Sequence, residues 1–131
     1  MSEKNNVYIT TTLPYVNADP HVGFAMEIIR ADVLARHHRL KGSNVFFNTG
    51  TDEHGAKIAE AAEKEGVDPK TYTDRYAEKF RELKELLGLS VDNFVRTTDD
   101  HHVMAAQEFW NKCLANTNER GDPDIYKKLY R

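Results

Sequence analysis

The chain has 131 residues, of which 40% are apolar and 30% are charged, and its formal net charge is −3. This composition is typical of one globular domain, and it argues against a stand-alone nucleic-acid binder that depends on a basic surface. The single cysteine, Cys113, excludes an intrachain disulfide and a cysteine-based metal site, which fits a reducing, cytoplasmic setting. No apolar stretch of about 18 residues occurs, so we expect neither a signal peptide nor a membrane span.

The first part of the chain predicts a strand, a loop, a helix and a second strand. Val7–Thr12 is short and rich in β-branched residues, which predicts a central parallel strand buried on both faces. The loop Pro14–Pro20 is rich in Pro, Asn and Asp. His21–Leu40 repeats apolar residues at helical spacing, and Gly42 ends that helix. Val45–Thr49 has the composition of the next strand.

The rest of the chain predicts three helices and one strand. Lys57–Lys64 and Asp68–Leu87 have helical patterns, Asn93–Arg96 is a short strand, and Asp99–Leu114 is a further helix. The order β-α-β-α-α-β-α predicts an α/β fold with a parallel sheet and helices on its faces. At the end, Ile125–Arg131 has the composition of the start of another strand. Because a doubly wound sheet of three strands is small, we expect the chain to be truncated.

The junction between the first strand and the first helix is the candidate ligand site. In open α/β sheets ligands bind at the carboxyl ends of the strands, where a helix N-terminus offers N–H groups to phosphate. His21 lies at this helix start and can donate to an anionic oxygen. Gly23 has no side chain, so a base or a ribose can approach the backbone closely. Alone, each residue also has a simpler interpretation, a helix cap for the histidine and helix packing for the glycine.

Several strings of the sequence, taken together, resemble one family. Pro20–Gly23 (PHVG) after the first strand resembles the HIGH element of class I aminoacyl-tRNA synthetases. Further strings resemble those of the methionyl-tRNA synthetases: Leu13–Ala18 (LPYVNA), Ala31–Arg36 (ADVLAR) followed by His38–Gly42 (HRLKG), Gly50–Gly55 (GTDEHG) and Phe94–Asp99 (FVRTTD). The chain therefore resembles the first part of the methionyl-tRNA synthetase catalytic domain.

The resemblance implies a fold and a reaction. The fold is a partial Rossmann-like, doubly wound parallel sheet, with residues 1–131 as the N-terminal half of the catalytic domain, truncated near the family's connective insertion. In the complete enzyme the reaction is ATP-dependent activation of methionine to methionyl-adenylate, followed by transfer of the methionyl group to tRNA(Met). ATP with Mg²⁺ is the implied cofactor. Zinc is expected only in the downstream insertion, and no metal ligand is expected within this chain.

The resemblance also implies roles for single residues. Leu13 and Tyr15 would line the methionine site, where an apolar wall and an aromatic ring suit a thioether. Asp52 would hold the substrate's ammonium group. His21 would contact the phosphates of ATP as a catalytic residue, and Gly23 would lie beneath the adenosine. Two alternatives stay open: core packing for Leu13 and Tyr15, and capping of the following helix for Asp52.

The sequence departs from the family in two ways. Phe24 stands where the family has the second HIGH histidine, a catalytic and ATP-binding residue, and losing one such donor typically costs about 2.7–4 kcal/mol. We expect its ring to pack against the ribose or the adenine, so that nucleotide still binds but activation is slower. The KMSKS loop, the zinc insertion and the anticodon-binding domain are absent. We therefore expect negligible synthetase activity from this chain alone, and exposed apolar surface.

The remaining acidic and histidine residues, and two other classes of protein, give further expectations. Glu53 and His54 are acid–base neighbours in a loop, for which we expect a solvated or structural role. The adjacent pairs His37-His38 and His101-His102 point in different directions on their helices, so we expect no metal chelation by them. A non-catalytic module that binds nucleotide or methionine is one alternative function. Another class I synthetase, such as the leucyl or cysteinyl enzyme, is a second, against which the GTDEHG and LPY strings argue.

Overall fold

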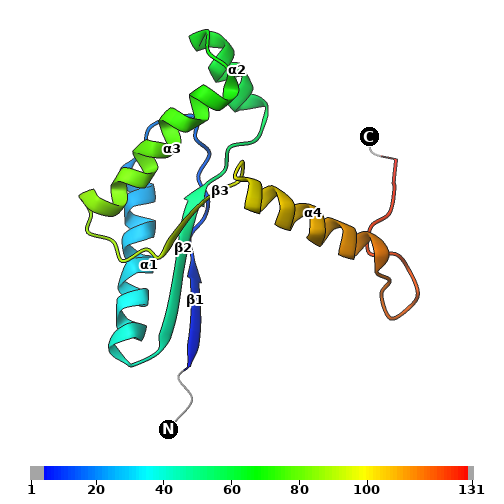
Figure 1. The fold of residues 1–131 in the computed structure, drawn as a ribbon, viewed down its shortest axis with the longest axis horizontal. Coiled ribbons are helices and arrows are strands. Elements are labelled where there is room, and N and C mark those ends of the chain that lie inside the picture. Colours follow the sequence, from blue (N-terminus) through cyan, green and yellow to red (C-terminus); the bar gives the residue numbers. More distant parts are fainter. Residues whose placement is uncertain (1–4, 130–131) are drawn as a thin grey trace. The chain divides into compact units, whose positions relative to one another are not determined.

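Strands and helices follow one another along the chain in the predicted order, β-α-β-α-α-β-α (Figure 1). This computed structural model describes residues 5–129, which divide into two compact units on either side of the Thr98–Asp99 bond. The elements of the first unit are β1 (Asn6–Thr10), α1 (Val22–Leu40), β2 (Asn44–Thr51), α2 (Ala56–Glu65), α3 (Pro69–Leu86) and β3 (Asn93–Arg96). The second unit contains α4 (Asp100–Ala115). The predicted α/β fold with a parallel sheet is confirmed.

The three strands form one parallel sheet in the order β1-β2-β3. The register pairs Val7 with Val45 and Thr49 with Phe94. The prediction that the first strand is central and buried on both faces is wrong, because β2 is central and β1 pairs only with β2 among the described residues. Tyr8 of β1 is 64% exposed and its ring stacks on Phe46. A β-branched composition favours a strand, but it does not say how many neighbours that strand has.

The core of the first unit lies between the sheet and two helices. Figure 1 shows α1 and α3 along the same side of β2, and the buried side chains fill the space between them. The aromatic members are Phe24 of α1, Phe47 of β2, and Tyr72 and Phe80 of α3. The rings of Phe24 and Phe80 meet edge to face, with their centroids 5.3 Å apart. This packing holds α1 on the sheet, and so it fixes where the N-terminus of α1 lies relative to the strand ends.

Local signals explain where the helices begin and end. The Asp68 side chain accepts a hydrogen bond from the Thr71 amide at 3.0 Å, and Pro69 follows in the first turn, so α3 begins there. Gly66 ends α2 in a left-handed conformation with φ of 68°, which glycine adopts without steric cost. These ends match the sequence predictions closely because caps are local interactions.

The second unit differs from its prediction at the C-terminus. Residues 125–129 form no strand, and residues 130–131 of the predicted strand lie outside the described part of the chain. The preceding turn-rich segment instead closes on itself, through a bridge between Thr117 and Pro123 and two amide hydrogen bonds to the side chain of Asn118. A strand needs a neighbouring strand to pair its backbone N–H and C=O groups, and the composition of a segment does not show whether such a neighbour exists.

Apolar side chains are exposed along α4. No residue of this helix is buried, and its exposed apolar side chains are Val103, Met104, Phe109, Trp110 and Leu114. Despite this apolar surface, none of the helices in residues 5–129 is both long and apolar enough to cross a membrane.

Candidate functional site

The site begins where β1 ends and the chain turns toward α1. The Thr12 amide donates to Glu27 Oε1 at 2.7 Å, and the Thr12 hydroxyl donates to the two carboxylate oxygens at 2.8 and 2.9 Å. Glu27 belongs to α1, so this contact ties the end of the strand segment to the helix. Leu13, the next residue, is half-buried, whereas Tyr15 is 60% exposed. The core-packing alternative therefore does not hold for Tyr15.

A backbone bridge brings the Tyr15 segment to the end of β2. The Asp52 amide donates to the Pro14 carbonyl at 2.9 Å, and the Val16 amide donates to the Asp52 carbonyl at 3.3 Å. Tyr15 and Asp52 are thus partners in a parallel bridge, and the fully buried Val16 side chain anchors it. Residues that are far apart in the sequence, and that were predicted to share a ligand, therefore lie side by side.

His21 is the N-cap residue of α1, which confirms the simpler interpretation of this residue. Its Nδ1 accepts a hydrogen bond from the Gly23 amide at 3.1 Å. When the ring is neutral, an accepting Nδ1 places the ring proton on Nε2, so Nε2–H remains available as a donor. A Cβ at Gly23 would lie 2.9 Å from Cε1 of the same ring. The glycine therefore makes room for the imidazole, and a cap and a ligand contact are compatible.

Phe24 lies in the core and not at the surface of the site. Its side chain is 7% exposed and packs against Phe80. This placement disagrees with the expectation that the ring packs against a ribose or an adenine, because the core of the first unit encloses the ring. Burial of an aromatic ring in a close-packed core stabilises the fold, which gives Phe24 a role that needs no ligand.

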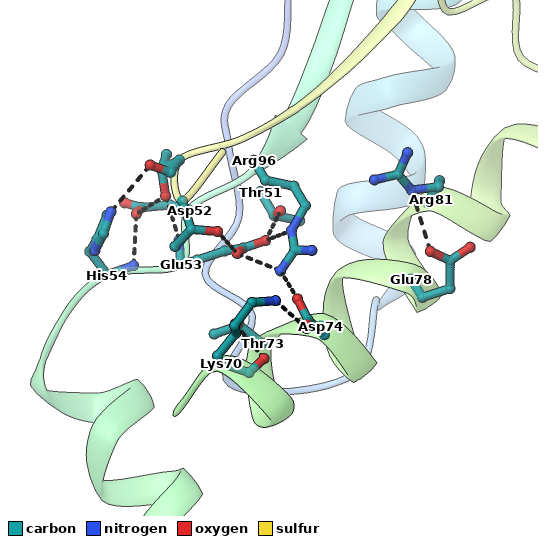
Figure 2. A network of polar contacts seen from close by, with 12 residues as sticks. Thr51, Asp52, Glu53, His54, Lys70, Thr73, Asp74, Glu78, Arg81 and Arg96 are labelled. Carbon is teal, nitrogen blue, oxygen red and sulfur yellow. Dashed lines mark hydrogen bonds and ion pairs between the residues drawn. The ribbon is translucent and has the colours of Figure 1, made fainter. Parts of the chain in front are cut away.

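Asp52 follows β2 and is half-buried (Figure 2). Its Oδ1 accepts from the His54 amide at 3.2 Å and, more distantly, from the Thr97 hydroxyl at 3.4 Å. Among the described residues, none donates to Oδ2 and none forms an ion pair with Asp52. The helix-capping alternative is wrong, since α2 is capped by Gly55 without a side-chain hydrogen bond.

Glu53, by contrast, points inward and has a fully buried side chain. Arg96 binds its two carboxylate oxygens through Nε at 2.6 Å and Nη2 at 2.8 Å. The hydroxyls of Thr51 and Thr98 donate to the same carboxylate. The expected structural role of Glu53 is confirmed. The exposed His54 ring lies beside this group, with Nε2 3.3 Å from the Thr97 carbonyl oxygen.

Arg96 is the residue to which the sequence assigned no role, although it stands inside the FVRTTD string. It lies at the end of β3 and also donates to Asp74 Oδ1 of α3 at 2.6 Å. The hydrogen bond to Glu53 raises the pKa of Arg96 above its usual value. Hydrogen bonds from Lys70 first, and from Arg96 second, hold the pKa of Asp74 below its usual value. A sequence signal for this pair was present: Arg96 ends one strand, and the acids Asp52 and Glu53 directly follow the neighbouring strand.

A cavity of about 300 Å³ opens beside this edge of the sheet. It is lined by Tyr15, Asn17, His54, Gly55, Ala56, Lys57 and Ile58. Of the predicted methionine-site residues in the described chain, Tyr15 lines this cavity, whereas Leu13 and Asp52 do not. Across residues 5–129, no group of three or more His, Cys, Asp or Glu side chains is arranged to hold a metal ion.

An open parallel sheet with helices on its face and polar groups at the carboxyl ends of its strands defines a Rossmann-like nucleotide fold. A family model described as tRNA synthetases class I (M) matches residues 7–129, and the chain belongs to this family.

The similar proteins agree with this family. The methionine–tRNA ligase of Thermotoga maritima is 47% identical over 124 residues, which are 95% of this chain and 19% of that protein. The methionine–tRNA ligase of Brucella suis is 42% identical over 127 residues, 97% of this chain and 24% of that protein. Among solved structures, Mycobacterium tuberculosis methionyl-tRNA synthetase in complex with methionyl-adenylate matches with a TM-score of 0.81 and 44% identity, over 83% of this chain and 21% of that one. The chain thus spans about a fifth to a quarter of the length of these relatives.

Proposed function

We propose that residues 1–131 form the N-terminal half of the Rossmann-like catalytic domain of a methionine–tRNA ligase. In the complete enzyme this half serves the ATP-dependent activation of methionine and the transfer of the methionyl group to tRNA(Met). The observation that carries the proposal is the bridge between Tyr15 and Asp52, at the carboxyl ends of the strands, in a chain of this family. This backbone bridge brings together a residue with an exposed aromatic ring and a residue whose carboxylate forms no ion pair within residues 5–129. An aromatic ring suits the thioether end of methionine, and a carboxylate suits its ammonium end.

The methionine would be held at its two ends. The ammonium group is placed against Asp52 Oδ2, which has no donor among the described residues. A carboxylate is an acceptor only, which is what an ammonium group requires. The thioether side chain is placed against the exposed ring of Tyr15, with Leu13 as a further apolar contact, since sulfur packs well against aromatic rings.

The nucleotide would be held at the start of α1. His21 Nε2–H donates to a phosphate oxygen, and the backbone at Gly23 lies beneath the adenosine. A carboxylate oxygen of methionine attacks the α-phosphorus, the bond from that phosphorus to the bridging oxygen of the β-phosphate breaks, and pyrophosphate leaves. Mg²⁺ is proposed to enter with the phosphates of ATP, and zinc to belong to the family's connective insertion. In such chemistry the protein mainly positions the groups and stabilises charge.

The proposal is tested by methionine binding to this chain, measured by NMR titration. Wild-type protein is expected to bind L-methionine more tightly than its analogue without the amino group, because Asp52 recognises the ammonium. Asp52→Asn is expected to abolish that preference by removing the charge. Asp122→Asn, a carboxylate of the second unit, is the matched control and is expected to retain it. Equal preference in wild type and Asp52→Asn would contradict the assignment of Asp52.

A further inference from the structure

The carboxylate of Asp52 is held weakly by its own contacts. Its two hydrogen bonds, at 3.2 and 3.4 Å, are long for bonds to a charged group. Its neighbours in the chain, Thr51 and Glu53, are both buried, with relative exposures of 0% and 5%. The position of Asp52 is therefore decided mainly by what holds the residues on either side of it.

Glu53 is held by the bidentate fork of the Arg96 guanidinium, which donates to both of its carboxylate oxygens. Burying a carboxylate is costly unless it is paired and its oxygens are satisfied, and here two hydrogen bonds from Arg96 and two from threonine hydroxyls satisfy it. Such a pair adds little net stability compared with an apolar core, but it accepts only one geometry. A buried fork of this kind is suited to fixing the direction of the adjacent backbone.

Thr97, which follows Arg96, contacts Glu53 and also the two residues on either side of it, Asp52 and His54. The Thr97 hydroxyl accepts from the Glu53 amide at 2.8 Å and donates to Asp52 Oδ1. The Thr97 carbonyl meets the His54 ring. Three consecutive residues at the end of β3 therefore clamp three consecutive residues after β2. Figure 2 shows the polar contacts of this clamp, with Arg96 reaching from it to Asp74 on α3.

The same network leaves one carboxylate without a cation. Arg96 compensates the charge of Glu53, and Lys70 and Arg96 together compensate Asp74. In this part of the described chain, Asp52 forms no ion pair. A cationic ligand that reaches this edge of the sheet is therefore attracted to Asp52 and not to the two acids beside it.

We propose that Arg96, through its bidentate pair with Glu53, is a positioning residue that fixes the Asp52 carboxylate for the ammonium group of the amino-acid substrate. This inference rests on the proposed function for its ligand. The positioning itself is a property of the free chain, so the two can be tested separately.

The positioning is tested by amide hydrogen exchange in Arg96→Lys, because lysine keeps the charge but loses the fork. The amides of Glu53 and His54, which donate to Thr97 and Asp52, are expected to exchange about tenfold faster. The matched control is Arg36→Lys, since Arg36 holds Asp32 at 2.6 Å and Asp32 accepts from the Ser90 amide. In that control the Ser90 amide is expected to change while Glu53 and His54 do not.

A second variant keeps the test decisive if Arg96→Lys does not fold. Thr97→Val removes the hydroxyl that joins the Glu53 amide to Asp52, while the Arg96–Glu53 pair remains. It is expected to speed exchange at the Glu53 amide, and Thr97→Ser is expected to restore the wild-type rate. Unchanged exchange at Glu53 and His54 in folded variants would overturn the proposal. So would uniformly faster exchange across the whole first unit, which a merely structural role predicts.

Methionine binding supplies the second readout. Arg96→Lys is expected to weaken L-methionine binding about tenfold, a loss of about 1.4 kcal/mol, and to leave the analogue without an amino group unaffected. Arg36→Lys is expected to change neither. If exchange responds as expected but the wild-type chain shows no preference for the amino group, the proposed function fails and the clamp stands as a structural finding. If wild type shows the preference and Arg96→Lys retains it fully, the positioning role is overturned.

Discussion

The two ends of the parallel sheet use arginine–carboxylate pairs in different ways. Before β3, Asp32 is paired with Arg36 and Asp92 with Arg39, and each of these acids also accepts a hydrogen bond from a backbone amide. Where β3 ends, Arg96 pairs with Glu53, but Asp52, the residue next to Glu53, forms no ion pair within the described chain. At the first end every one of these charges is used to join elements of the fold. At the second end the charge of Glu53 is used in this way, whereas Asp52 forms no ion pair within residues 5–129.

The arginine–carboxylate pairs at the two ends also differ in burial. The Arg96 and Glu53 side chains are 16% and 0% exposed, whereas Arg36 is 51% exposed. Water can replace a lost partner at the exposed pair, but it cannot easily do so at the buried one. We therefore expect the free energy of unfolding to fall more when the arginine at the carboxyl end of the sheet is lost.

Arg96→Met is expected to reduce the free energy of unfolding by about 3–5 kcal/mol, because it leaves the Glu53 carboxylate buried without its cation. Arg36→Met is expected to cost about 1–2 kcal/mol, since solvent reaches that pair. Urea unfolding of both variants, followed by circular dichroism, measures the difference. Equal losses would break the comparison between the two ends of the sheet.

Gly50→Ala and Gly42→Ala compare the two ends of β2. A Cβ at Gly50 would lie 1.8 Å from the Val95 carbonyl oxygen, so β2 and β3 would have to separate. We expect a loss of about 1–3 kcal/mol, together with a shift of the Asp52 and Thr97 amide resonances. Gly42 has φ of +83° and nothing within 4 Å of a Cβ, so only backbone strain of about 1 kcal/mol is expected there. Similar spectra for the two variants would argue against tight packing at Gly50.

The smallest expected effect is on pH dependence. Hydrogen bonds from Lys70 and then Arg96 place the folded-state pKa of Asp74 below its ordinary value of 3.8. A carboxylate whose pKa is lowered by folding stabilises the fold at pH values above its ordinary pKa. This stabilisation is lost as the pH falls through the folded-state pKa. Asp74→Asn is therefore expected to lose less stability than wild type between about pH 5 and pH 2, measured by urea unfolding at each pH. An unchanged acid dependence would show that water screens this half-exposed carboxylate completely.

Much of the fold was accessible to sequence reasoning because its signals are local. The cap at Asp68, the proline that follows it and the left-handed Gly66 mark helix ends through contacts within a few residues. Where a partner decided the outcome, the same reasoning was less successful. Within the described residues, the first strand lies at the edge of the sheet, residues 125–129 form no strand, and Phe24 is buried in the core.

For the site, the sequence by itself determined the family resemblance and the chemistry of the predicted residues. Strings such as LPY and GTDEHG identify the family, and they also contain the side chains for which a role was predicted. Only the tertiary structure decided that Tyr15 and Asp52 meet, since their bridge joins the segments that follow two different strands. It also decided that Glu53 is buried against Arg96, while its neighbour Asp52 forms no ion pair with any residue that the structure describes. Adjacent residues after a strand point in different directions, and the pairing of distant segments selects which of the two carboxylates is compensated by an arginine.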